Sequence, residues 1–195
     1  MNLPNKLTML RVLMIPVFVA LYLAGSFFWA LVVFALAAIT DALDGMLARK
    51  YKLVTNFGAL MDPLADKLLV MTAMICFVFE FLVHPAIVIV LLSREFLVTS
   101  IRLVAAGKGV VIAADTWGKL KTVFQMIWIM VGLLWAWMGD LTSPQRGVAF
   151  WAQYRFEVLS SFSLVFNVLT WIVVVLTVLS GANYIVRNWR LIGDA

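Results

Sequence analysis

Six apolar runs, each long enough for a helix that crosses a lipid bilayer, constrain this chain more than any other feature. A helical span needs about 20 mostly apolar residues. Hydrophobic residues make up 65% of the 195 and charged residues only 13%, so the chain lacks the polar residues to cover a soluble core. We therefore expect an all-α integral membrane protein with one domain over residues 1–195. The expected transmembrane helices lie near residues 7–24, 27–49, 60–83, 86–106, 119–139 and 160–186.

The lysines and arginines predict the orientation of these helices, because positive residues gather on the cytoplasmic side of a membrane. The connection after the third span contains Glu80 and His84 but no lysine or arginine. We therefore expect both termini in the cytoplasm, with the formal net charge of +5 beside anionic headgroups rather than nucleic acid. The cationic residues expected on the cytoplasmic side are Lys6, Arg11, Arg49, Lys50, Lys52, Lys108, Lys119, Lys121, Arg187 and Arg190.

Four aspartates interrupt the apolar pattern where the second span ends and the third begins. Asp41 and Asp44 are three residues apart, and Asp62 and Asp66 are four apart, so each pair shares one face of a helix. With Leu53 at the centre of the turn, Asp44 and Asp62 each lie nine residues away. Antiparallel helices would bring the two pairs to matching depths. The spacing therefore predicts that four carboxylates converge in one small volume.

Converging carboxylates repel one another unless a cation neutralises them. Oxygen ligands suit Mg²⁺, Mn²⁺ or Ca²⁺, and a chain with one histidine, His84, and one cysteine, Cys76, offers little for zinc. Acidic groups around one or two Mg²⁺ ions are the arrangement expected for phosphoryl-type transfer. The alternative is a set of ion pairs at headgroup depth. The cations available for such pairs are Arg49, Lys50, Lys52 and Lys67.

The pattern around the aspartates resembles the signature of the CDP-alcohol phosphatidyltransferase family. It reads D-x-x-D-G-x-x-A-R, eight residues, then G-x-x-x-D-x-x-x-D, without departure at any fixed position. The number of expected spans agrees with this family, so the resemblance covers the whole chain. The matching residues are Asp41, Asp44, Gly45, Ala48, Arg49, Gly58, Asp62 and Asp66.

The resemblance implies an enzyme that moves a phosphatidyl group from CDP-diacylglycerol to an alcohol and releases CMP. Asp41, Asp44 and Asp62 would ligate Mg²⁺ or Mn²⁺, with two ions expected, and Asp66 would both touch the metal site and act as the base. It also implies a homodimer in the bacterial cytoplasmic (inner) membrane, with the active site facing the cytoplasm. The residues expected to bind the CDP-lipid are Asn5, Thr8, Gly45, Arg49, Thr55 and Gly58.

A second group of charges bears on the identity of the accepting alcohol. Ionisable residues within spans are functional candidates, and a cluster of cations near the aspartates would suit a phosphate-bearing acceptor. The alternative is that Glu95 simply pairs with Arg94 or Arg102. The residues expected to bind the acceptor phosphate are Arg94, Arg102, Lys119, Lys121 and Arg187.

The segments NLPNKLTMLRVLMIPVF, SREF and WGKLKT are most similar to family members that use sn-glycerol 3-phosphate, which we therefore expect as the acceptor. Inositol phosphate and serine are the alternative acceptors. A protein of a different class, a divalent-cation transporter, would distribute its acids across the membrane. Here the four motif aspartates lie on the cytoplasmic half, which favours the enzyme.

Overall fold

The regular structure of the chain is entirely helical within the part that the structure describes, as the sequence predicted. Six helices are present there: α1 (Leu3–Leu23), α2 (Phe27–Tyr51), α3 (Asn56–Phe79), α4 (Pro85–Gly107), α5 (Thr116–Leu141) and α7 (Arg155–Arg187). The computed structural model describes the backbone of residues 3–51, 56–108, 112, 116–141 and 155–188, with side chains except at 3–7, 41–51, 56–64, 66 and 155–158.

The turn between α3 and α4 explains why α3 ends four residues before the predicted end of the third span. The third span was expected at 60–83, but α3 begins and ends earlier. Phe81 has a positive φ of 56°, a left-handed conformation that commonly follows the end of a helix. His84 then caps α4: its Nδ1 accepts a hydrogen bond of 3.2 Å from the backbone N–H of Ala86, and Pro85 occupies the first turn.

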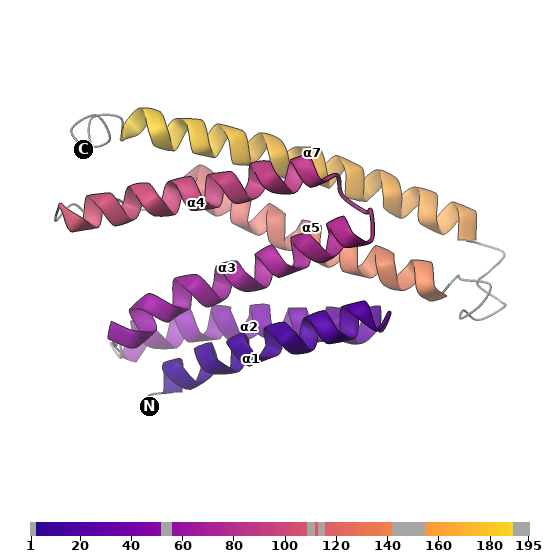
Figure 1. The fold of residues 1–195 in the computed structure, drawn as a ribbon, viewed down its shortest axis with the longest axis horizontal. Coiled ribbons are helices and arrows are strands. Elements are labelled where there is room, and N and C mark those ends of the chain that lie inside the picture. The colour runs from indigo at the N-terminus through magenta and orange to yellow at the C-terminus, as the bar shows by residue number, and fades with distance from the viewer. Residues whose placement is uncertain (1–2, 52–55, 109–111, 113–115, 142–154, 189–195) are drawn as a thin grey trace.

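The helices are arranged with several of their termini at the same end of the molecule. α1 starts there and α7 finishes there, and α2 ends and α3 begins at the same end (Figure 1). α1 packs against both α2 and α3, while α5 packs against α2 and α7, and α4 against α7. The side of the membrane on which the two termini lie stays a prediction.

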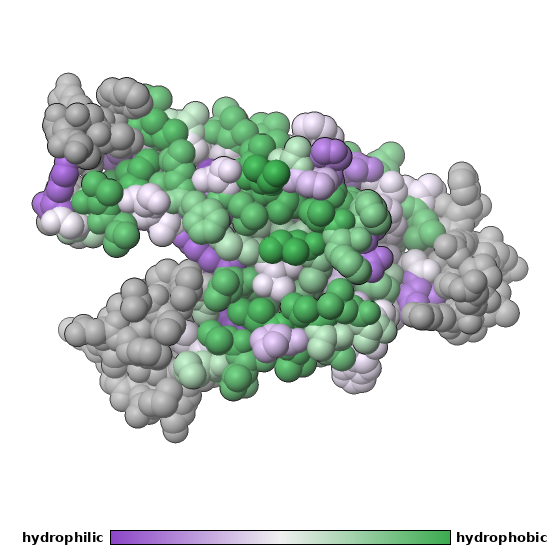
Figure 2. Space-filling view, viewed as in Figure 1, coloured by the Kyte–Doolittle hydropathy of each residue, from purple (hydrophilic) through white to green (hydrophobic). Residues whose placement is uncertain are grey.

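The surface of the bundle is apolar over most of the face seen in Figure 2. Large apolar side chains are exposed on every described helix, including Leu13, Trp29, Ile75, Leu103 and Trp171. Such a surface is costly in water and suits lipid. Among the described residues, Thr116–Leu141 and Leu159–Arg187 are by themselves long and apolar enough to cross a membrane. The stretches Thr8–Leu23, Phe27–Thr40 and Lys67–Phe79 are the apolar parts of α1, α2 and α3 within the described side chains.

An aromatic cluster joins α3, α5 and α7 in the core. The rings of Trp128 and Phe166 stack with centroids 5.5 Å apart, and Phe77 meets Trp128 edge-on at 5.7 Å. The indole N–H of Trp128 donates a 2.8 Å hydrogen bond to the hydroxyl of Thr170, so the buried ring leaves no unsatisfied donor. Gly132 allows these rings to approach the backbone of α5, because a Cβ there would lie 2.5 Å from Phe77 and 2.7 Å from Phe166.

This close approach predicts that Gly132→Val destabilises the fold. The added side chain would overlap two packed rings, and overpacking a core costs about 1–3 kcal/mol or more. Thermal unfolding in detergent, followed by tryptophan fluorescence, should give a lower midpoint than wild type. Gly107→Val is the matched control, since a Cβ at Gly107 meets nothing within 4 Å. Equal midpoints for the two variants would contradict the packing described here.

Candidate active site

The four motif aspartates occupy similar positions on α2 and α3 when residues are counted from the ends of these helices at the turn. Asp41 lies ten residues before Tyr51, the last residue of α2, and Asp66 lies ten residues after Asn56, the first of α3. Both segments belong to the end of the molecule where α2 ends and α3 begins. The four aspartate side chains lie outside the described residues, so their convergence stays a prediction. Among the side chains that are described, no three His, Cys, Asp or Glu residues gather as a metal-binding group.

Of the residues expected to bind the CDP-lipid, the structure describes the side chain of Thr8 alone. Thr8 is buried on α1, with 1% of its surface exposed. The backbones of Asn5, Gly45, Arg49 and Gly58 are helical, but their side chains or surroundings lie outside the described residues. The whole of Thr55 lies outside them.

Arg11, one turn after Thr8, is a candidate that the sequence analysis treated only as a topology signal. Its side chain is fully buried on the inner face of α1. A guanidinium at this position is costly unless anionic or polar groups surround it. The signal available in the sequence was a cation three residues from a predicted ligand-binding threonine, on the same helix face.

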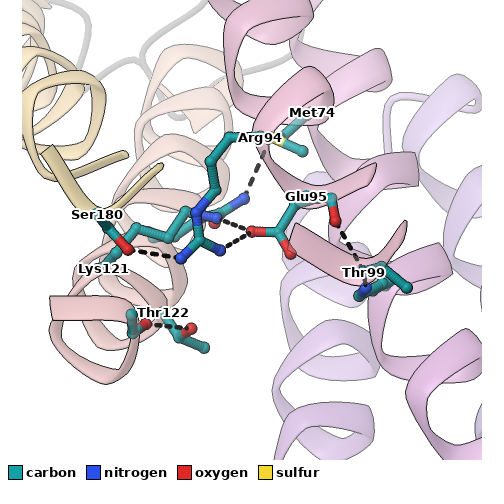
Figure 3. Close-up of polar contacts among 10 residues, drawn as sticks. Met74, Arg94, Glu95, Thr99, Lys121, Thr122 and Ser180 are labelled. Atoms are coloured by element: carbon teal, nitrogen blue, oxygen red, sulfur yellow. Dashed lines mark hydrogen bonds and ion pairs between the residues drawn. The ribbon is translucent and has the colours of Figure 1, made fainter. Parts of the chain in front are cut away.

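The second charged group is a partly buried cluster that joins α4, α5 and α7, which we call the Glu95 cluster. It consists of Arg94, Glu95, Lys121 and Ser180 (Figure 3). One carboxylate oxygen of Glu95, Oε1, accepts hydrogen bonds from both Lys121 and Arg94, the latter at 3.2 Å. Arg94 also donates to the hydroxyl of Ser180 at 2.6 Å. Lys121 is only 1% exposed. The cluster therefore holds two cations against one carboxylate.

Two glycines shape the space that Arg94 occupies. A Cβ on Gly118 of α5 would lie 3.3 Å from Nη2 of Arg94, and a Cβ on Gly181 of α7 would lie 3.2 Å from its Cγ. The arginine thus passes between two helices that approach it closely. This packing fixes the direction of the guanidinium towards Glu95 and Ser180.

The remaining residues expected at an acceptor-phosphate site lie apart from the Glu95 cluster. Arg102 is exposed; its Nε donates to the hydroxyl of Tyr184 at 3.2 Å, and its guanidinium lies 5.6 Å from the centre of that ring. Lys119 and Arg187 are exposed near the same end of the molecule, at the start of α5 and the last turn of α7. The structure thus brings Arg94 and Lys121 together. Of the two expected pairings of Glu95, it contains the one with Arg94.

A cavity of about 310 Å³ is lined by residues of α1, α2, α3, α4 and α5, and it borders the Glu95 cluster through Glu95 itself. Part of its lining is apolar and rich in methionine, with Met71, Met74 and Met126. Two of its lining segments adjoin the aspartates, because Ala38 lies one turn before Asp41 and Lys67 directly follows Asp66. The polar residues of the lining are Arg11, Lys67, Glu95, Thr122 and Gln125.

Lys67 connects this part of α3 to α4. Its ammonium group donates to the hydroxyl of Thr99, and the same hydroxyl donates to the backbone carbonyl of Glu95 at 2.7 Å. From the sequence, Lys67 was expected only as an ion-pair partner for the aspartates. In the structure it also lines the cavity, immediately beyond the position of the proposed base.

Comparison with known proteins identifies the family of this chain. The profile of the CDP-alcohol phosphatidyltransferase family matches residues 1–179. The chain is 40% identical to the CDP-diacylglycerol–glycerol-3-phosphate 3-phosphatidyltransferase of Bacillus subtilis (strain 168), over 97% of this chain and 96% of the relative. It is 42% identical to the protein of that name from Haemophilus influenzae, over 69% and 76% respectively. A probable phosphatidylglycerophosphate synthase of Mycobacterium tuberculosis is 36% identical, over 98% and 84%.

Proposed function

The chain belongs to the CDP-alcohol phosphatidyltransferase family, and on that premise we propose that it transfers the phosphatidyl group of CDP-diacylglycerol to sn-glycerol 3-phosphate. The products are phosphatidylglycerophosphate and CMP. The observation that carries this proposal is the near full-length similarity to relatives whose names specify this donor and acceptor. The enzyme is an integral membrane protein, as its family and its apolar helices indicate.

We propose that Asp41, Asp44, Asp62 and Asp66 hold two divalent ions, Mg²⁺ or Mn²⁺. The donor set fits such ions, because it consists only of carboxylates and the four residues occupy similar positions on α2 and α3 when counted from the turn. When bound, the ions would neutralise the diphosphate and stabilise the charge that develops on CMP.

In the reaction, the primary hydroxyl of the acceptor attacks the phosphorus that bears the diacylglycerol. A new P–O bond forms, the P–O bond to CMP breaks, and the hydroxyl proton passes to Asp66. Donor binding is assigned to the residues that the family signature and the N-terminal segment indicate. These are Asn5, Thr8, Gly45, Arg49, Thr55 and Gly58, of which Arg49 supplies a guanidinium suited to phosphate oxygens.

The acceptor phosphate is assigned to cations on α4, α5 and α7. Support comes from their distribution. Lys121 is buried and Arg94 is partly buried, and both contact Glu95, which lines the cavity. Arg102, Lys119 and Arg187 lie towards the end of the molecule where α2 ends and α3 begins. Their combined positive charge would attract an anionic acceptor. We further propose that the chain is one domain over residues 1–195. In this proposal it forms a homodimer in the inner membrane, with both termini and the active site on the cytoplasmic side.

The experiment that tests the proposed function offers radiolabelled acceptors in parallel to purified enzyme with CDP-diacylglycerol and Mg²⁺. We expect a lipid product from glycerol 3-phosphate and none from inositol phosphate or serine. Chelation of the metal should abolish the product, and added Mg²⁺ or Mn²⁺ should restore it.

Two outcomes would count against the assignment. CMP release that is equally fast with and without glycerol 3-phosphate would refute the acceptor. Uptake of divalent ions into proteoliposomes without nucleotide lipid, in the absence of any transferase activity, would instead favour a transporter.

A further inference from the structure

The geometry of the cavity points to a role beyond the motif residues: we propose that Gln125, with Glu95, binds the hydroxyl of the acceptor that does not react. This inference rests on the proposed function, because it names the part of the acceptor that the cavity recognises. The ligand class is a small polyol phosphate, and the residues would discriminate it from a phosphate ester with a single hydroxyl.

Gln125 is a buried polar side chain with unused hydrogen-bonding capacity. It lies on α5, is 4% exposed, and lines the cavity. Its amide Nε2 donates to the sulfur of Met74 at 3.4 Å, and sulfur is a weak acceptor. Among the described residues, its amide oxygen Oε1 has no hydrogen-bond partner. Because an unsatisfied buried amide is costly, this group is suited to a ligand hydroxyl.

Glu95 offers a second acceptor atom on the same cavity. Its Oε1 is held by Arg94 and Lys121, whereas its Oε2 makes no hydrogen bond to any described residue. The two cations hold the carboxylate in one orientation. Binding of a ligand to Oε2 would therefore cost less side-chain entropy than binding to a mobile carboxylate. A carboxylate oxygen and an amide together can accept and donate, which matches a hydroxyl group.

The rest of the lining agrees with a polyol phosphate as the occupant. Met71, Met74 and Met126 form an apolar wall suited to the C–H groups of a short carbon chain, while Lys67 and Arg11 supply positive charge. The cavity also lies close to the position of the proposed base on α3. Val70, another lining residue, follows Asp66 by four residues and therefore shares its face of α3.

The test compares two acceptors that differ in one hydroxyl, glycerol 3-phosphate and 1,3-propanediol monophosphate. Both carry a phosphate and a primary hydroxyl, but the second lacks the secondary hydroxyl. We expect wild-type enzyme to prefer glycerol 3-phosphate in kcat/KM by about 10- to 100-fold, the range for one unsatisfied buried polar group. Gln125→Met, of similar length and without hydrogen-bonding groups, should raise KM for glycerol 3-phosphate and leave KM for the deoxy acceptor within about threefold.

Thr177→Val is the matched control, because Thr177 is fully buried on α7 and does not line the cavity. It should leave the preference between the two acceptors unchanged. Gln125→Leu replaces the methionine variant if the latter fails to fold. The inference is overturned if wild type uses both acceptors equally, if Gln125→Met weakens both alike, or if it raises KM only for CDP-diacylglycerol. A wild-type enzyme that makes no product from glycerol 3-phosphate would instead refute the proposed function.

Discussion

Asp66→Asn is expected to lower turnover by about 10²- to 10⁴-fold while CDP-diacylglycerol binding stays within a few-fold of wild type. Asparagine has nearly the shape of aspartate and keeps one oxygen that can approach a metal ion. It cannot accept the proton of the attacking hydroxyl, so the loss should appear mainly in kcat. The measurement pairs the rate of CMP release with equilibrium binding of the CDP-lipid to the purified variant.

Asp140→Asn is the matched control for this substitution. Asp140 lies near the end of α5 that is remote from the aspartates, and the same change there should leave turnover near the wild-type rate. Full activity of Asp66→Asn would remove the proposed base. A variant that also loses the CDP-lipid would assign Asp66 to metal or donor binding instead of proton transfer.

Glu95→Gln is expected to destabilise the protein by about 3 kcal/mol, the lower end of the cost of removing one partner from a buried ion pair, because Lys121 is buried while Glu95 is partly exposed. The substitution preserves shape but leaves Arg94 and Lys121 without their shared carboxylate. Thermal unfolding in detergent should show a clear fall in the midpoint. Glu80→Gln provides the control, since Glu80 is exposed in the turn after α3.

A second substitution tests whether the loss of stability in Glu95→Gln comes from unbalanced positive charge or from altered packing. Lys121→Met in the Glu95→Gln background removes one of the two uncompensated cations and should recover part of the lost stability. An additive loss in the double variant would show that the pair does not interact energetically. A Glu95→Gln variant as stable as wild type would show that the carboxylate contributes nothing to the fold.

The fold could be predicted from the sequence because lipid imposes one rule on every span. In lipid, an apolar run must form all its backbone hydrogen bonds within itself, and a helix does so. The ends of the apolar runs then indicate where the turns lie. The turn before α4 was harder, because it depends on the left-handed conformation of Phe81 and on a cap made by His84. Neither of these two features can be recognised from the hydropathy of the sequence.

The candidate site could be predicted only where spacing within one helix decides the geometry. The two aspartate pairs are of this kind. The partners of Lys121 and Arg102 depend instead on how α4, α5 and α7 align with one another: Lys121 meets Glu95, whereas Arg102 meets Tyr184. The role proposed for Gln125 could not be predicted from the sequence, because this residue is a single amide within an apolar run. Its position becomes informative only once the cavity that it lines is known.

The length of α7 has a consequence for the surroundings of the protein. Its apolar part, Leu159–Arg187, contains 29 residues and would extend about 43 Å, whereas the hydrocarbon layer of a bilayer is about 30 Å thick. The helix must therefore incline strongly or carry its ends into the headgroups. Either way, lipids with shorter or longer chains would change the angle at which α7 meets α4. Bilayer thickness is thus a variable to which the packing around Arg94 and Tyr184 should respond.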